Sequence, residues 1–171
     1  MQLSTLLLGA FALTASALPS ATFPQASNKW KRDNYTFHST ISDPGFYAVS
    51  FPPDYHEDQI LQWNQLPTTT GSTAALVARF PAGFAVTQSG PAKIDVYRRT
   101  SGGLGDYIGT VGPLAVEADG SSSVAEAVDI IVADLTPAES FTFEFRIDSE
   151  EDNASLQFFE NDDAGFFIRT S

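Results

Sequence analysis

The clearest pattern in this sequence is a strict alternation of apolar and polar residues over Ser140–Asp148. Four apolar side chains, three of them phenylalanines, alternate there with polar or charged ones without a break. A period of two is typical of a β-strand that has one face on a core and the other in water. Ala92–Arg98 and Ala74–Phe80 follow the same rule. These three segments predict an antiparallel sheet.

Weaker strand signals follow one another through the rest of the chain. They cover Tyr35–Ser39, Phe46–Phe51, Ile60–Trp63, Phe84–Gln88, Tyr107–Val111, Leu114–Ala118, Val124–Leu135, Leu156–Glu160 and Phe166–Thr170. Turn sequences rich in Gly, Pro, Asp and Ser lie between them. A strand and its turn take roughly 8–12 residues, which is the spacing of a sandwich or a barrel. We therefore predict an all-β fold, an antiparallel β-sandwich of about 8–10 strands.

Val124–Leu135 is the ambiguous segment in this series. Ala125-Glu126-Ala127 could begin a helical turn, whereas the β-branched run Ile130-Ile131-Val132 favours a strand. We predict a strand there.

The start of the chain has a different pattern. The apolar run Leu6–Leu13 is too short to cross a bilayer, which takes about 20 residues. Ala15-Ser16-Ala17 follows it with the small-x-small pattern that signal peptidase accepts. We expect residues 1–17 to be a secretory signal peptide that is cleaved after Ala17. A buried N-terminal helix is disfavoured, because the segment has no amphipathic face and Pro19 follows it.

Residues 18–32 predict a polar linker that ends in the basic pair Lys31-Arg32. In a secreted chain, such a pair in an exposed linker is a candidate for proteolytic removal of a short pro-segment. Two ordinary solvated charges are the alternative. The remaining segment, 33–171, has the length of a single domain, and we predict one β-sandwich domain there.

Composition limits the partners and the chemistry. The chain has 21 acidic residues against 9 Lys and Arg, and its formal net charge is −12 at pH 7. Such a charge repels phosphate backbones and anionic lipid, so we expect no nucleic-acid partner and no membrane contact after signal removal. There is no cysteine, which removes disulfides, thiol nucleophiles and zinc–thiolate sites. The domain must therefore be held by its core, for which the 14 phenylalanines are available.

Two N-glycosylation sequons are present, Asn34-Tyr35-Thr36 and Asn153-Ala154-Ser155. We predict glycans on Asn34 and Asn153 of the exported chain. Asn153 falls in a polar segment where a bulky group is tolerated, and Asn34 lies near the expected mature terminus.

Several short motifs resemble a known family when they are taken in order. Leu76–Arg79, Phe80-Pro81-Ala82-Gly83 and Ala92–Tyr97 form an apolar strand that ends near Phe-Pro, a Gly-containing loop and an Ile-Asp-Val-Tyr strand. Near the end of the chain come Ser155–Phe159, the acidic loop Glu160–Asp163 and the strand Gly165–Thr170.

From about Phe46 onwards, this order resembles a fungal family of secreted-type domains. The family is the But-two C-terminal domain, named after a protein that binds a ubiquitin-like modifier. The resemblance implies a β-sandwich and a fungal source, and it implies no catalytic residues. Many members carry a cysteine beside the strand that corresponds to Leu76–Phe80, where this chain has Ala75. Binding of an intracellular modifier does not fit an exported chain.

Catalytic motifs are sparse. A Ser-His-acid site could use only His38 or His56, and no Gly-x-Ser-x-Gly elbow is present. His56 lies among acidic residues, and we interpret it as a solvated loop histidine. Paired carboxylates for glycoside hydrolysis stay open, although nothing singles out one pair. We predict no catalytic residue, no cofactor and no metal.

Two binding hypotheses deserve weighing. The acidic segments Asp148–Asn153 and Glu160–Asp163 could supply oxygen ligands to calcium. They flank one predicted strand and should lie at opposite ends of the sheet, so solvated loops are favoured. Trp63, Tyr55 and Tyr97 could form a sugar-stacking platform, but most aromatic residues of such a domain belong to its core.

The sequence therefore favours a secreted, non-enzymatic β-sandwich that acts as an extracellular interaction module. Its expected partner is an extracellular protein or a glycan. A carbohydrate-binding module is the first alternative. The second is a hydrolase that acts on polysaccharides at acidic pH.

Overall fold

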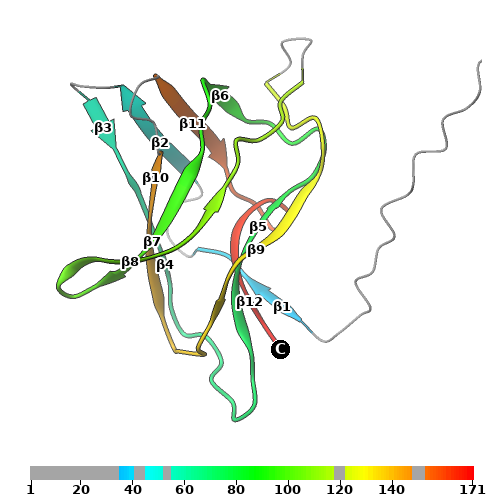
Figure 1. Ribbon diagram of the computed structural model, residues 1–171. Coiled ribbons are helices and arrows are strands. Elements are labelled where there is room, and N and C mark those ends of the chain that lie inside the picture. Colours follow the sequence, from blue (N-terminus) through cyan, green and yellow to red (C-terminus); the bar gives the residue numbers. More distant parts are fainter. Residues whose placement is uncertain (1–34, 41–44, 52–54, 118–121, 148–152) are drawn as a thin grey trace, which may run out of the picture. The chain divides into compact units, whose positions relative to one another are not determined.

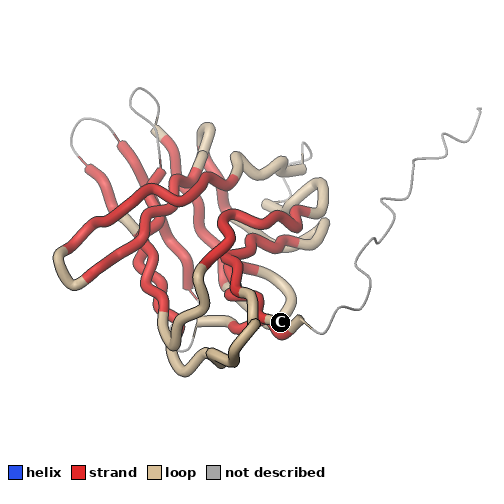
Figure 2. The backbone as a smooth tube through the Cα atoms, turned by 60° about the horizontal axis from the view of Figure 1, so that its bottom comes forward, coloured by secondary structure: helices blue, strands red, loops and turns tan. Residues whose placement is uncertain are grey.

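The alternating segment forms the strand β10 (Phe141–Ile147), a central strand of its sheet. The computed structural model describes residues 35–40, 45–51, 55–117, 122–147 and 153–171. These residues form strands and loops, with no helix among them (Figure 2). The other strands are β1 (Thr36–His38), β2 (Gly45–Phe51), β3 (Tyr55–Glu57), β4 (Gln59–Trp63), β5 (Ala74–Phe80), β6 (Thr87–Ser89), β7 (Ile94–Thr100), β8 (Gly103–Val111), β9 (Val128–Leu135), β11 (Ala154–Phe159) and β12 (Gly165–Thr170).

The strands form three four-stranded antiparallel sheets. Their strand orders are β1-β12-β5-β9, β4-β10-β7-β8 and β3-β2-β11-β6 (Figure 1). The prediction of an all-β antiparallel sandwich is therefore confirmed. The twelve strands among the described residues exceed the expected number, and β3, a three-residue strand at a sheet edge, is the one that no predicted segment covers.

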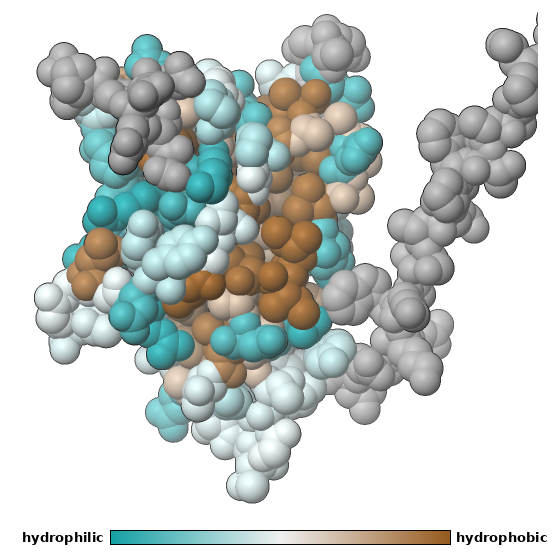
Figure 3. Space-filling view, viewed as in Figure 1, coloured by the Kyte–Doolittle hydropathy of each residue, from teal (hydrophilic) through white to brown (hydrophobic). Residues whose placement is uncertain are grey.

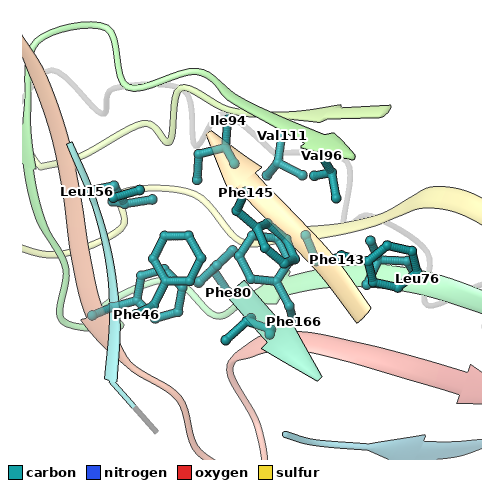
Figure 4. Packing of buried hydrophobic residues seen from close by; sticks show 14 of the residues in the cluster. Phe46, Leu76, Phe80, Ile94, Val96, Val111, Phe143, Phe145, Leu156 and Phe166 are labelled. Carbon is teal, nitrogen blue, oxygen red and sulfur yellow. The ribbon is translucent and has the colours of Figure 1, made fainter. Parts of the chain in front are cut away.

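The core lies where the three sheets meet. Phe46 of β2, Phe80 of β5, Phe145 of β10 and Phe166 of β12 are all fully buried, and their rings point toward one another (Figure 4). The ring centroids of Phe145 and Phe166 are 4.5 Å apart, and those of Phe46 and Phe158 are 4.6 Å apart. Replacing one such buried phenylalanine by alanine costs about 3–5 kcal/mol. This aromatic cluster takes the place of the missing disulfides.

One of the weaker strand predictions, which begins at Leu114, differs from the structure. Leu114–Ala118 was expected to be a strand, but its described part only forms an isolated bridge between Val116 and Val124. The Gln88 side chain explains the difference. Its amide nitrogen donates to the Leu114 carbonyl at 3.1 Å, and its amide oxygen accepts from the Leu114 N–H at 3.3 Å. A side chain thus satisfies the backbone groups that a neighbouring strand would otherwise pair.

Predictions for the N-terminal region lie outside the described residues. They are the signal peptide over 1–17 with cleavage after Ala17, the linker 18–32 with Lys31 and Arg32, and the sequon residue Asn34. Within the part of the chain that the structure describes, no helix is long and apolar enough to cross a membrane.

Candidate functional site

The sheet β3-β2-β11-β6 turns alternate residues inward and outward, and its outward set is rich in aromatic side chains. Inward residues such as Phe46 and Leu156 are buried. We name the outer surface the aromatic face; the strand register places on it Tyr47, Val49, Phe51, Tyr55, Glu57, Thr87, Ser89, Ser155, Gln157 and Phe159. Val49, between Tyr47 and Phe51, is fully buried by its surroundings. This surface is the first candidate for a binding site.

Four aromatic side chains of this face reach solvent. Phe159 is 67% exposed, Tyr55 49%, Phe51 37% and Tyr47 36%. Phe51 and Tyr55 are cross-strand partners, and their rings stack with centroids 6.4 Å apart and an angle of 29° between planes. Exposed aromatic rings on one sheet face can pack against the apolar side of a ligand.

Hydroxyl and amide groups lie between these rings. Gln157 is exposed and pairs with Tyr47 on one side and Thr87 on the other. The hydroxyls of Ser89 and Ser155 are 2.8 Å apart. The aromatic face thus offers neutral hydrogen-bonding groups beside its rings.

The carboxylate of this face, Glu57, already has a partner. The Tyr55 hydroxyl donates a hydrogen bond to Glu57 Oε2. This hydrogen bond raises the pKa of Tyr55, so the phenol keeps its proton and donates it to the Glu57 carboxylate. Glu57 can still accept hydrogen bonds from a ligand through its second oxygen.

A groove of about 300 Å³ adjoins one end of the aromatic face. Three residues belong to both the groove and the face, namely Thr87, Gln157 and Phe159. The remaining lining residues are Phe84, Ala85, Val86, Ser122 and Phe158. All of them are uncharged, so the groove combines apolar walls with hydroxyl and amide groups.

The sheet β4-β10-β7-β8 has a very different outer surface, which we name the charged face. Its residues are Ile60, Asp95, Tyr97, Arg99, Leu104, Tyr107, Thr110, Thr142, Glu144 and Arg146. Figure 3 shows hydrophilic residues over the region where Figure 1 places β7 and β8. Tyr107 is exposed here too, but its hydroxyl lies 2.6 Å from the Thr110 hydroxyl and its ring meets Tyr97 edge-on at 5.7 Å.

Glu144 is the centre of the charged face and is only 3% exposed. Arg99 Nη1 lies 2.6 Å from Glu144 Oε2, and Arg146 Nε donates to Glu144 Oε1 at 2.8 Å. Arg146 Nε also lies 3.3 Å from Asp58 Oδ2, and His56 Nε2 contacts Asp58 Oδ1. The alternation predicted a solvated glutamate at this position. The two arginine side chains cover it instead.

The pKa values of the two carboxyl groups in this cluster shift in opposite directions. Burial tends to raise the pKa of Glu144, but the hydrogen bond from Arg146 and the charges of Arg146 and Arg99 outweigh burial and lower it. Burial and the nearby Glu144 raise the pKa of Asp58, against the opposing effect of His56 and Arg146. Arg146 contacts both carboxyl groups and joins them into one ion-pair cluster.

The predicted sugar platform is not assembled by the structure. Trp63 is fully buried, and its Nε1 donates to the His38 carbonyl at 3.0 Å. Tyr55 lies on the aromatic face and Tyr97 on the charged face. The rings that gather beside Tyr55 were not predicted from the sequence. The available signal for them was that aromatic residues occupy both inward and outward positions of Phe46–Phe51.

Each of the two histidines contacts a neighbouring side chain of the fold. His38 Nε2 lies 3.0 Å from Thr170 Oγ1, and burial lowers the pKa of His38. His56 belongs to β3 rather than to a loop, and it is the histidine that contacts Asp58.

The acidic loop after β11 is an ordered turn. Glu160 is 9% exposed; the Thr40 hydroxyl donates to its Oε2 at 2.8 Å and the Phe166 N–H to its Oε1 at 2.7 Å. Burial raises the pKa of Glu160. Asn161 Oδ1 accepts from the N–H groups of Asp163 and Ala164. Within the described residues, no group of three or more His, Asp or Glu is placed to hold a metal ion. Of the other acidic segment, Asp148–Asn153, residues 148–152 lie outside the described residues.

The sequon at Asn153 is accessible. Asn153 is exposed and immediately precedes β11, which begins the serine end of the aromatic face. Glycosylation of Asn153 stays a prediction.

The resemblance to the But-two C-terminal domain rests on short motifs. Comparisons with protein-family models, curated proteins and solved structures give no match to this chain. That resemblance stays a prediction, and the two sheet faces are the basis for inferring function.

Proposed function

We propose that this chain is a non-catalytic carbohydrate-binding module and that the aromatic face is its binding surface. The observation that carries the proposal is the set of four exposed aromatic rings on one sheet face. Soluble proteins keep large apolar patches covered unless the patch binds a partner. These rings therefore need a ligand that is itself partly apolar.

A sugar ring has the matching chemistry. It presents C–H groups on its faces, which pack against aromatic rings, and hydroxyl groups at its edges, which exchange hydrogen bonds with Ser, Thr and Gln. The aromatic face supplies both kinds of group within adjacent strands, since Gln157 lies between Tyr47 and Thr87.

A second exposed apolar surface lacks this combination. Ile130 and Ile131 of β9 are 41% and 45% exposed, and Figure 3 shows apolar surface over that strand. Aliphatic branches offer no flat ring for stacking, so β9 does not compete as a sugar site.

The predicted export of the chain agrees with this ligand class, because wall and matrix polysaccharides lie outside the cell. A protein partner is the competing proposal. The close interleaving of rings with hydroxyl and amide groups favours the glycan, since every sugar unit carries both C–H and O–H surface.

Pull-down on insoluble glucan, chitin and cellulose tests the proposal. We expect retention on at least one polymer, release by the matching soluble sugar, and loss of retention in the double variant Phe51→Ala/Tyr55→Ala. Tyr107→Ala is the matched control, because it removes an exposed tyrosine from the charged face. Far-UV circular dichroism verifies that each variant is folded. No retention on any polymer, or equal loss in the Tyr107→Ala control, contradicts the proposal.

A further inference from the structure

We infer that the groove beside Phe159 holds one uncharged sugar unit and restricts the ligand to neutral glycans. This inference rests on the proposed function and specifies its ligand class. It also adds a site that the exposed rings alone do not define, since the groove has walls of its own.

The groove has the construction of a small polar-ligand site. Phe158 lines the groove but is only 2% exposed, whereas Phe159 next to it in β11 is 67% exposed. Thr87, Ser122 and Gln157, which carry hydroxyl and amide groups, line the same space. Its volume of about 300 Å³ is at the lower end of the range for small-ligand pockets. A sugar ring fits a lining that combines apolar residues with neutral polar ones.

Charge decides between neutral and acidic sugars. None of the four strands of this sheet contains Lys or Arg, and the lining of the groove is uncharged. A uronate or sulfate placed there would lose water without gaining a cation, and transferring an unpaired charge out of water is strongly unfavourable. The carboxylate of Glu57 and the net charge of −12 add repulsion. The groove therefore selects against anionic polymers.

The register gives the path of a longer ligand. From the groove, a chain would cross β11 at Gln157, reach Tyr47 of β2 and approach the Phe51–Tyr55 pair at the β2–β3 edge. Figure 1 shows β6, β11, β2 and β3 in this order across the sheet. Three steps between neighbouring strands span roughly 14 Å across the sheet at ~4.8 Å each, and the four residues from Tyr47 to Phe51 add about 13 Å along β2 at ~3.3 Å each. That length accommodates several sugar units, with Phe159 as the ring at the groove.

Native affinity electrophoresis of the full chain tests this inference. The probes are hydroxyethyl cellulose, xyloglucan and a soluble β-glucan as neutral polymers, and alginate and pectate as acidic ones. We expect retardation by a neutral polymer and none by the acidic ones, at low and at high salt. Phe159→Ala should weaken neutral binding at least tenfold and Gln157→Leu about fivefold, while the control Tyr107→Ala leaves it unchanged.

Other outcomes separate the two levels of the proposal. Equal or tighter retardation by alginate or pectate overturns the neutral class while the binding module stands. Neutral binding that Phe159→Ala and Gln157→Leu leave intact, but Phe51→Ala/Tyr55→Ala abolishes, overturns the groove assignment alone. Retardation by no polymer overturns the proposed function itself. Melting curves show whether each variant is folded. Phe159 is exposed enough for its ring to be removed without opening the core.

Discussion

The aromatic face and the charged face are outer surfaces of two sheets in one domain, yet their side chains have opposite arrangements. On the charged face, the most polar group is buried, since Glu144 is 3% exposed and two arginines hold both of its oxygens. On the aromatic face, a large apolar side chain is exposed, since Phe159 is 67% accessible. The charged groups of the charged face are paired with one another, whereas the rings and amide groups of the aromatic face stay accessible to a ligand.

This difference separates a structural surface from a binding surface. A buried charge that has its partners in place contributes to the fold, and removing one partner is costly. An exposed ring contributes little to the fold, because most of its area stays in water. Stability measurements should therefore respond to the charged face, and binding measurements to the aromatic face.

The largest loss of stability is expected when the central carboxylate of the charged face is removed. Glu144→Ala leaves Arg99 and Arg146 without their shared carboxylate. We expect the free energy of unfolding to fall by about 2–3 kcal/mol, less than for a fully buried pair because the arginine side chains are partly exposed. Urea denaturation measures the change. Thr142→Ala, two residues earlier on the same face of β10, is the control and should cost less than half as much. Equal costs would contradict the account.

Acid should weaken the charged face before it affects the aromatic face. The pKa of Glu144 is lower in the fold than its usual 4.5, because Arg146 and Arg99 outweigh its burial. A lowered carboxyl pKa gives stability that is present above the usual value and is lost as the pH falls toward the folded value. We expect Glu144→Gln to flatten this acidic loss in melting temperatures measured from pH 6 to pH 3. Parallel curves for the wild type and the variant would be the contrary result.

Glu160 should show the opposite sign with a smaller amplitude. Burial raises its pKa, so its contribution to stability is complete below the usual value and is lost as the pH rises through the folded value. Glutamine can accept the Phe166 N–H and donate to the Thr40 hydroxyl. We therefore expect Glu160→Gln to gain stability relative to the wild type as the pH rises from 4 to 7. A stability difference that does not change over this range would exclude the assignment.

The smallest stability effect belongs to the aromatic face. Phe159→Ala and Gln157→Ala should change the free energy of unfolding by less than about 0.5 kcal/mol, as for other exposed positions. Chemical denaturation monitored by tryptophan fluorescence checks this, because Trp63 lies in the core. A loss above about 2 kcal/mol would show that these side chains support the fold.

The sequence pattern predicted the fold better than the site. Ala74–Phe80 was predicted with the bounds of β5, and β10 differs by one residue at each end, because unbroken alternation against a core leaves little freedom. β3 was missed, since three exposed residues at a sheet edge carry no periodicity. Period-two reasoning also places Glu144 outward, but it cannot foresee that Arg99 of another strand will cover it.

The binding surface depends on strands distant in sequence. Tyr47 and Gln157 meet because β2 pairs with β11, and no spacing along the chain encodes this pairing. Aromatic residues in both phases of a strand were the available signal. That signal marks Phe51 and Phe159 as outward, but it does not tell which other rings share their face.

The most direct test of the central claim is backbone NMR of the labelled protein during titration with a soluble, neutral β-glucan oligosaccharide. We predict chemical-shift changes at Tyr47, Gln157, Phe159 and their neighbours on β2, β6 and β11, and none on β7 and β10. Changes centred on Tyr97, Glu144 and Arg146 would contradict the assignment of the two faces.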